Sequence, residues 1–207
     1  MQAPIYLVRH GQTDWNAEQR VQGQAETDIN ALGRRQAKAN GQMLARLVPE
    51  PTSYVFIASP MRRTRETMEI IRAEIGLPRD GYLLEPRLVE IHFGDWQGST
   101  FAELEAARPG ATAGRDADKW NFRPPGDAAE SYAMLAERIR PWFAQLTTPS
   151  IVVTHGGVIR TLFHLANGLP GHDAAKMDVP QDRVLRFQDG RVGWIQSKLS
   201  GGAVSPE

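Results

Sequence analysis

The chain has 207 residues, no cysteine, and 24 basic residues balanced by 24 acidic ones. This length suits one sizeable domain, and the lack of cysteine excludes disulfides and thiolate metal sites. The net charge of zero gives no sign of binding to nucleic acid or to a membrane surface. We see neither a signal peptide nor an apolar run of the roughly 20 residues that span a bilayer, so we expect a cytoplasmic protein.

The first apolar run, residues 5–8, predicts a buried strand that stops at Arg9 and His10. The polar stretch over 12–30 is rich in glutamine and long for a connection, so we expect it to be functional. Residues 32–47 predict a helix, which Pro49 and Pro51 would end. Its candidate core positions are Leu32, Met43, Leu44 and Leu47.

A second buried strand is predicted over 54–58 and is followed by the sequence Ser-Pro-Met-Arg-Arg at 59–63. Residues 62–75 predict a helix, and 83–89 an extended segment. The stretch 94–125 is the least regular part of the chain. It predicts a short helix that Ser99 or Thr100 caps and that ends at Ala107, and then a mobile loop of small and polar residues over 111–119.

Residues 130–146 predict a helix with a kink or break at Pro141. The third apolar run, 151–154, predicts a strand that stops at His155, and a helix is expected over 158–167. The sequence Asp-Gly at 189–190 lies between two apolar segments and predicts a hairpin. The tail, 200–207, is expected to be disordered.

Strands alternate with helices in this order, which predicts an α/β fold with a mostly parallel sheet covered by helices. In open α/β sheets, ligands bind in the crevice beyond the carboxyl ends of the strands. The three apolar runs therefore bring two histidines and at least two arginines to one crevice. Arginine offers a planar fork to phosphate oxygens, and a neutral imidazole is a nucleophile, so this combination suits a phosphoryl group.

Four motifs occur in a fixed order along the chain. They are Leu-Val-Arg-His-Gly-Gln-Thr at 7–13 with Asn16; Ser-Pro-Met-Arg-Arg at 59–63 with Glu66 and Thr67; Leu-Val-Glu at 88–90 with Phe-Gly-Asp-Trp-Gln-Gly at 93–98; and Val-Thr-His-Gly-Gly at 153–157. In these motifs the chain resembles the histidine phosphatase superfamily, the group with phosphoglycerate mutase-like folds. The resemblance covers about residues 5–195.

The resemblance implies a three-layer α/β/α sandwich around a mostly parallel sheet. It also implies a single domain over residues 1–199, with a helical insertion at about 94–149. The implied chemistry is transfer of a phosphoryl group to a histidine of the first motif. Neither a metal nor another cofactor is expected, because the residues that the motifs gather are cationic rather than clustered carboxylates.

By the same resemblance, His10 is the nucleophile, and the alternative is an ordinary core or surface histidine. Arg9, Arg63 and His155 would hold the phosphoryl oxygens, since charge spreads over three oxygens in the transition state. The family pattern selects Arg63, and Arg62 is the alternative. The glycines after His155 begin a helix, whose free N–H groups favour an anion.

Glu90 resembles the family's proton donor to the leaving oxygen, and the alternative is an ion pair with Arg63. Polar loop residues align with family positions that line the phosphate or substrate pocket, although such residues are usually only solvated. The expected substrate-binding residues are Asn16, Gln22, Gly23, Thr13 and Gly156.

The resemblance includes both phosphatases and cofactor-dependent mutases. Phe101 stands where the mutases carry a lysine, and no Arg-Arg pair occurs in the insertion. Residues 124–131 are similar to a phosphatase segment Pro-Gly-Gly-Glu-Ser, with extra residues inserted. We therefore expect a phosphomonoesterase that hydrolyses small phosphorylated metabolites. The alternatives are a phosphoglycerate mutase and a non-catalytic phospholigand-binding protein. The oligomeric state stays open, and a homodimer is one option.

Overall fold

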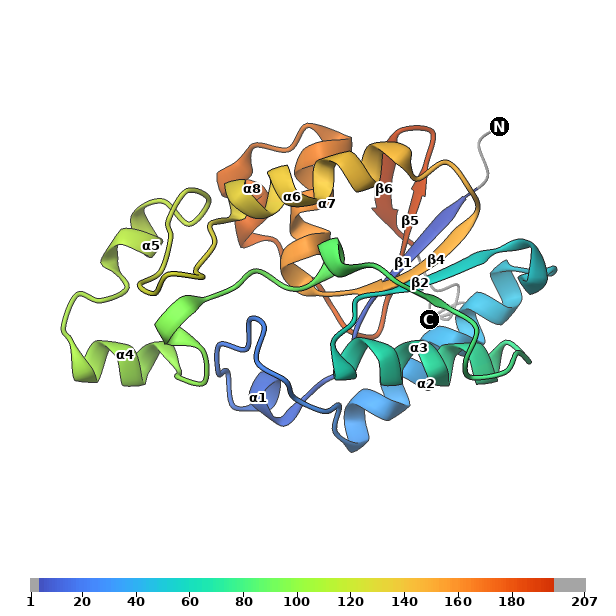
Figure 1. Ribbon diagram of the computed structural model, residues 1–207, viewed down its shortest axis with the longest axis horizontal. Coiled ribbons are helices and arrows are strands. Elements are labelled where there is room, and N and C mark those ends of the chain that lie inside the picture. The colour runs from blue at the N-terminus through green and yellow to red at the C-terminus, as the bar shows by residue number, and fades with distance from the viewer. Residues whose placement is uncertain (1–3, 196–207) are drawn as a thin grey trace, which may run out of the picture.

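The computed structural model describes residues 4–195, whose strands form one six-stranded sheet (Figure 1). The strands are β1 (Ile5–Arg9), β2 (Val55–Ala58), β3 (Leu83–Leu84), β4 (Ser150–Thr154), β5 (Val184–Gln188) and β6 (Arg191–Trp194). Their order in the sheet is β3-β2-β4-β1-β5-β6. The first four in this order are parallel, and β5 and β6 are antiparallel to their neighbours. The predicted α/β class is confirmed.

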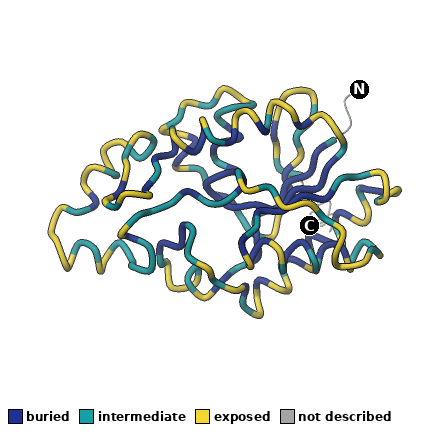
Figure 2. Tube along the Cα trace, viewed as in Figure 1, coloured by how far each residue is buried: buried dark blue, intermediate teal, exposed yellow. Residues whose placement is uncertain are grey.

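Alternate residues of the central strands face opposite sides of the sheet, as the pleat requires. In β1, Ile5 and Leu7 belong to one apolar cluster, whereas Tyr6 and Val8 belong to the other. Both faces of β1 are therefore buried, which explains its unbroken apolar run. The tube in Figure 2 shows the buried segments concentrated in the sheet and the helices against it.

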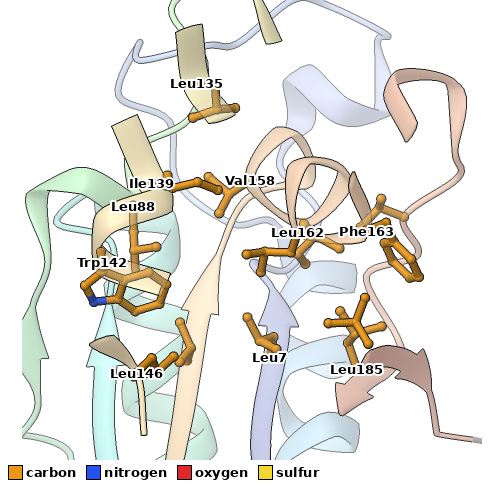
Figure 3. Packing of buried hydrophobic residues seen from close by; sticks show 14 of the residues in the cluster. Leu7, Leu88, Leu135, Ile139, Trp142, Leu146, Val158, Leu162, Phe163 and Leu185 are labelled. Carbon is orange, nitrogen blue, oxygen red and sulfur yellow. The ribbon is translucent and has the colours of Figure 1, made fainter. Parts of the chain in front are cut away.

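One face of the sheet is covered by α6 (Tyr132–Gln145), α7 (Gly156–Asn167) and α8 (Gly171–Lys176). Leu135 and Ile139 of α6 and Leu162 of α7 pack in one cluster with Leu7 and Leu185 of the sheet (Figure 3). The predicted helix over 130–146 is continuous through the proline at 141, which lies at an exposed position. The short helix α8 was not predicted.

The other face is covered by α2 (Ala31–Leu47) and α3 (Arg62–Glu74), which contribute Leu44, Met68 and Ile71 to the second cluster. Of the predicted core positions in α2, Leu44 is fully buried. The prediction is wrong for Leu32, which is 39% exposed. Small residues of α2 are buried instead: Gly33, Ala37 and Gly41. Gly33 lies against the loop after β1, and Gly41 lies against Ile71 and Glu74 of α3. These small residues let α2 approach its neighbours closely.

A lobe formed by α4 (Phe101–Ala107) and α5 (Ala113–Ala117) extends away from the sheet, on the same side as α1 (Asp14–Ala17) (Figure 1). The predicted cap of α4 is confirmed at Thr100. The expected mobile loop over 111–119 is wrong, because it contains α5. Both carboxylate oxygens of Glu105 fix the approach to α5 by accepting hydrogen bonds from Gly110 N and Thr112 N.

Two smaller predictions have different outcomes. The extended segment over 83–89 is correct only for β3, because Pro86 begins a 3-10 helix to Leu88. Proline has a fixed φ that suits the first position of a helix. The hairpin is confirmed: Asp189 and Gly190 have φ of 51° and 78°, as a two-residue turn between β5 and β6 requires.

The predicted disordered tail lies outside the described residues. Within residues 4–195, no helix has both the length and the apolar character needed to cross a membrane.

The contact of the first turn of α2 with the loop after β1 has a testable consequence. A Cβ on Gly33 would overlap the backbone carbonyl of Gln12. Alanine ordinarily stabilises a helix relative to glycine by up to about 1 kcal/mol, but here we expect Gly33→Ala to lower the free energy of unfolding by about 2 kcal/mol, as overpacking does. Urea denaturation measures the change.

The matched control is Gly193→Ala in β6, where a Cβ would meet no atom within 4 Å. We expect it to change the free energy of unfolding by less than about 0.5 kcal/mol. Equal stabilities of the Gly33→Ala variant and the parent protein would contradict the prediction.

Candidate active site

A pocket of about 340 Å³ opens beside the carboxyl end of β1. Its walls include most of the residues that the sequence predicts for the site: Arg9, His10, Asn16, Gln22, Gly23, Arg63 and Glu90. Arg9 is the last residue of β1, and His155 directly follows β4. Because β1 and β4 are parallel neighbours, their carboxyl ends meet at the same edge of the sheet.

The imidazole of His10 is buried and has a defined proton position. Its Nδ1 lies 2.8 Å from the carbonyl oxygen of Gly11. Since a carbonyl only accepts hydrogen bonds, Nδ1 is the donor and Nε2 carries the lone pair. Burial lowers the pKa of His10 well below its ordinary value, and the nearby Arg63 and Arg9 lower it further. The ring is therefore neutral at neutral pH.

His155 lies next to His10, with the two ring centroids 5.2 Å apart. Its side chain is fully buried, and Nε2 lies 2.8 Å from the hydroxyl oxygen of Ser59. The opposite nitrogen, Nδ1, is buried without a hydrogen-bond partner. Burial lowers the pKa of His155 well below its ordinary value, and the charge of Arg63 lowers it further.

Backbone carbonyls hold both arginines in place. Arg9 donates from Nη1 to Val179 O at 2.7 Å, and Arg63 donates to Gly23 O at 2.7 Å and Ala25 O at 2.8 Å. Burial lowers the pKa of each arginine to about 10, so both stay charged at neutral pH.

Each of these arginines keeps an unpaired nitrogen at Nε. Within residues 4–195, four buried side-chain nitrogen or oxygen atoms have no hydrogen-bond partner, and three of them are Arg9 Nε, Arg63 Nε and His155 Nδ1. Buried polar groups normally have partners. Arg9 and Arg63 line the pocket, whereas His155 does not line it and lies behind the wall against His10. Unpaired donors in these positions are suited to an anion.

Glu90 is held by the beginning of α7. Its two carboxylate oxygens accept hydrogen bonds from Gly157 N at 3.0 Å and from Ile91 N at 2.9 Å. A Cβ at Gly157 would overlap Glu90 Oε1, so a larger residue there would displace the Glu90 carboxylate from this position. The alternative ion pair does not form in the described part of the chain: Arg63 donates to backbone carbonyls, and Glu90 accepts from backbone N–H groups.

The expected substrate-binding residues divide into two groups. Asn16 lies in the wall, and its Oδ1 accepts a hydrogen bond from Gln181 Nε2 at 3.0 Å. Gln22 and Gly23 also line the pocket. Thr13 and Gly156 do not. Thr13 is fully buried and caps α1, and Gly156 is buried at the first position of α7, where a Cβ would lie 3.4 Å from Arg9 Nε.

The alternative arginine, Arg62, points away from the pocket and pairs with Glu26 and Asp28 on the surface. Further pocket residues were missed in the sequence. They are Gln19, Arg20, Val21, Phe93, Phe101, Arg115, Lys119, Tyr132 and Arg160. Arg160 follows Gly156 by four residues, a helical spacing that could have indicated it. Nothing local in the sequence indicates that Arg115 and Lys119 reach the same pocket.

Within residues 4–195, no group of three or more His, Cys, Asp or Glu side chains is placed to hold a metal ion. The positive charge of the pocket comes from side chains. The sheet, the crevice, the orphaned donors and the neutral histidine together give an α/β protein with a cationic pocket whose chemistry suits an anion.

This class agrees with the known proteins that the chain is similar to. The chain belongs to the histidine phosphatase superfamily (branch 1), whose family model matches residues 5–198. It is a phosphatase of that superfamily, as the four motifs predicted.

The relatives differ in their stated activities. A glucosyl-3-phosphoglycerate phosphatase of Mycolicibacterium vanbaalenii is 37% identical over 179 residues, which cover 80% of this chain and 75% of that protein. A protein of Erwinia tasmaniensis named as a probable phosphoglycerate mutase, GpmB, is 32% identical over 202 residues, 93% of this chain and 88% of that one. A mycobacterial glucosyl-3-phosphoglycerate phosphatase solved with inorganic phosphate superposes with a TM-score of 0.73 at 28% identity, covering 96% of this chain and 98% of that one.

The lowered pKa of His10 links stability to pH. In the unfolded chain a histidine binds a proton near pH 6.5, but the buried ring does not. The uncharged His10 thus makes its full contribution to the free energy of unfolding above pH 6.5. As the pH falls below 6.5, this contribution is lost by up to about 1.4 kcal/mol per pH unit for each such group. We expect His10→Gln to make the decline between pH 6.5 and 5 shallower.

Urea denaturation at a series of pH values measures this slope independently of any stability that the substitution itself removes. Parallel curves for His10→Gln and the parent protein would show that His10 binds as many protons in the folded chain as in the unfolded one, which would contradict the prediction.

Proposed function

We propose that this phosphatase hydrolyses small phosphomonoesters through a phosphohistidine on His10. The observation that carries the proposal is the environment of that ring. It is neutral and fixed by Gly11, its Nε2 lone pair is free, and unpaired nitrogens of Arg9 and Arg63 accompany it. In the first step Nε2 forms the bond to phosphorus as the bond from phosphorus to the ester oxygen breaks.

The three orphaned nitrogens would pair with the phosphoryl oxygens. Arg9 and Arg63 supply permanent charge. If the Ser59 hydroxyl donates to Nε2 of His155, Nδ1 carries the proton and becomes a third donor. Charge grows on these oxygens in the transition state, so preorganised donors lower the barrier.

Glu90 is suited to move the proton. It lies in the pocket wall, and its carboxylate is fixed by the beginning of α7. In its protonated form it would give a proton to the departing ester oxygen. The resulting carboxylate would then take a proton from the water that attacks the phosphohistidine, which restores both groups.

The remaining wall residues define the space for the substrate. Asn16, Gln22 and Gly23 would contact the phosphoryl group or its neighbours, whereas Thr13 and Gly156 support Asn16 and Arg9 from outside the pocket. A volume of about 340 Å³ suits a small metabolite. Catalysis without a metal or another cofactor, the cytoplasmic location and a homodimer remain predictions from the sequence.

A single turnover with a ³²P-labelled phosphomonoester tests the nucleophile. We expect label on His10 after rapid acid-free quenching and peptide mapping, because the phosphoryl group must rest there before water attacks. His10→Ala should remain folded by circular dichroism and lose at least about 10³-fold in kcat. Turnover near that of the parent protein, or label on another residue, would refute the assignment.

The mutase alternative is supported by one structural observation. The sequence predicted no second anion clamp, but Arg115 and Lys119 of the insertion line the pocket together with Arg160. A mutase must return the phosphoryl group to a retained intermediate before water reaches it. The lack of the Arg-Arg pair therefore does not separate the two reactions, and the partition of the phosphoryl group must be measured.

We expect water to be the main acceptor. With 3-phosphoglycerate and catalytic 2,3-bisphosphoglycerate, released phosphate should exceed 2-phosphoglycerate by at least about tenfold. Coupled assays of both products in one reaction give the ratio. Isomerisation that depends on the bisphosphate and outruns hydrolysis would establish the mutase instead.

A further inference from the structure

Glu90 lies in a stretch of chain that belongs to no helix or strand. The stretch follows the 3-10 helix that ends at Leu88 and stops where another 3-10 helix, Gly94–Trp96, begins. Its backbone is not part of the sheet, and its partly buried carbonyl groups need hydrogen-bond partners from elsewhere. The side chains that supply these partners therefore decide where Glu90 lies.

Arg138 of α6 binds the carbonyl groups on the N-terminal side of this stretch. Its Nη1 donates to Arg87 O at 2.6 Å and to Val89 O at 3.0 Å, and its Nη2 donates to Glu90 O at 3.3 Å. The remaining N–H groups, on Nε and Nη2, donate to the two carboxylate oxygens of Glu130, each at 2.8 Å. A guanidinium has five N–H donors, so every donor of Arg138 is in use.

Glu130, which lies just before α6, binds the stretch on the other side of Glu90. Its backbone N–H donates to His92 O at 2.8 Å, and its Oε2 accepts a hydrogen bond from His92 N at 3.1 Å. One ion pair thus holds the backbone on both sides of Glu90. The side chains of Arg138 and Glu130 are only 21% and 16% exposed, so water competes little for these charge-assisted hydrogen bonds.

The two ends of Glu90 are fixed by different helices. The carboxylate accepts a hydrogen bond from Gly157 N at the beginning of α7, whereas the carbonyl group is bound by Arg138 of α6. Gln24 Nε2 also donates to this carbonyl, at 2.9 Å. A misplacement of about 1 Å in a reacting group can slow a reaction by about 100-fold. The placement of the backbone therefore decides how well Glu90 can deliver a proton.

We propose that Arg138 and Glu130 form a positioning pair that holds Glu90 within reach of the departing ester oxygen. Neither residue lines the pocket beside His10, so both act through the backbone of residues 87–92 and touch no substrate atom. This inference rests on the proposed function, in which Glu90 is the proton donor. The pair therefore matters most for esters whose leaving oxygen is strongly basic, because that oxygen needs a proton as its bond to phosphorus breaks.

Two substrates of similar size test the positioning pair. p-Nitrophenyl phosphate releases a weakly basic phenolate that leaves without a proton, whereas benzyl phosphate releases a strongly basic alkoxide that needs one. The measured quantity is kcat/KM, which reports the steps up to phosphorylation of His10. The ratio of its two values does not depend on the fraction of a variant that is folded. We expect Arg138→Gln to lower kcat/KM at least about tenfold more for benzyl phosphate than for p-nitrophenyl phosphate.

Two conservative variants test each half of the ion pair. Arg138→Lys keeps the charge but has three donors and no planar fork. Glu130→Gln keeps an oxygen that can accept from His92 N but removes the negative charge. We expect each to lower kcat/KM about threefold or more in favour of p-nitrophenyl phosphate, so the test does not depend on Arg138→Gln being folded.

The matched control is Arg140→Gln. Arg140 belongs to the same helix and pairs with Glu137, but these side chains are 52% and 71% exposed. The control should leave the ratio unchanged. Glu90→Gln should lower kcat/KM at least about 100-fold more for benzyl phosphate, and adding Arg138→Gln to it should not change the ratio further, because the two residues act as a unit.

Equal losses for the two substrates in the Arg138 and Glu130 variants would overturn the positioning pair, because that result indicates general damage to the site. A further change of the ratio in the Glu90→Gln background would also overturn it, since Arg138 would then act independently of Glu90. If Glu90→Gln itself lowers both values equally, the proposed role of Glu90 as proton donor is refuted instead.

Discussion

The site depends on keeping an imidazole uncharged between two guanidinium groups. Burial and the two positive charges both oppose protonation of His10, and the Gly11 carbonyl fixes which nitrogen carries the single proton. A cationic environment attracts an anion and at the same time preserves the lone pair that attacks the substrate in the proposed mechanism. One arrangement thus serves binding and nucleophilicity, which explains why the arginines must be rigid and why the fold encloses them so completely.

The two arginines are held in place by backbone carbonyls and not by carboxylates. Arg63 is tied to the carbonyls of Gly23 and Ala25, and Arg9 to that of Val179. An acidic partner would neutralise the charge that the substrate needs, whereas a carbonyl orients the guanidinium and leaves its charge intact. The same bonds attach the glutamine-rich loop to the first turn of α3 and the segment before β5 to the end of β1.

The sequence predicts the parts of this site that follow directly from buried strands. The apolar runs before Arg9 and His155 fix where these residues lie, because parallel neighbours end at one edge. Leu32 shows the limit of such patterns: α2 meets the loop after β1 and α3 through the glycines at 33 and 41, which helical apolar spacing does not reveal. Arg115 and Lys119 were unpredictable for another reason. Their approach to the pocket depends on long-range aromatic packing by Trp120.

The packing of Trp120 against Tyr132 and His164 fixes the point at which the lobe of α4 and α5 rejoins the rest of the protein. Gly171 leaves room for the Trp120 indole, since a Cβ there would overlap its ring atoms. Trp120 follows the lobe formed by α4 and α5, which extends away from the sheet (Figure 1). The lobe therefore rejoins the helices that cover the sheet at a fixed point. Its interior can be lengthened, shortened or recharged while the strands that carry His10 and His155 keep their geometry. This arrangement lets substrate preference evolve through changes in the lobe while the chemical step stays the same.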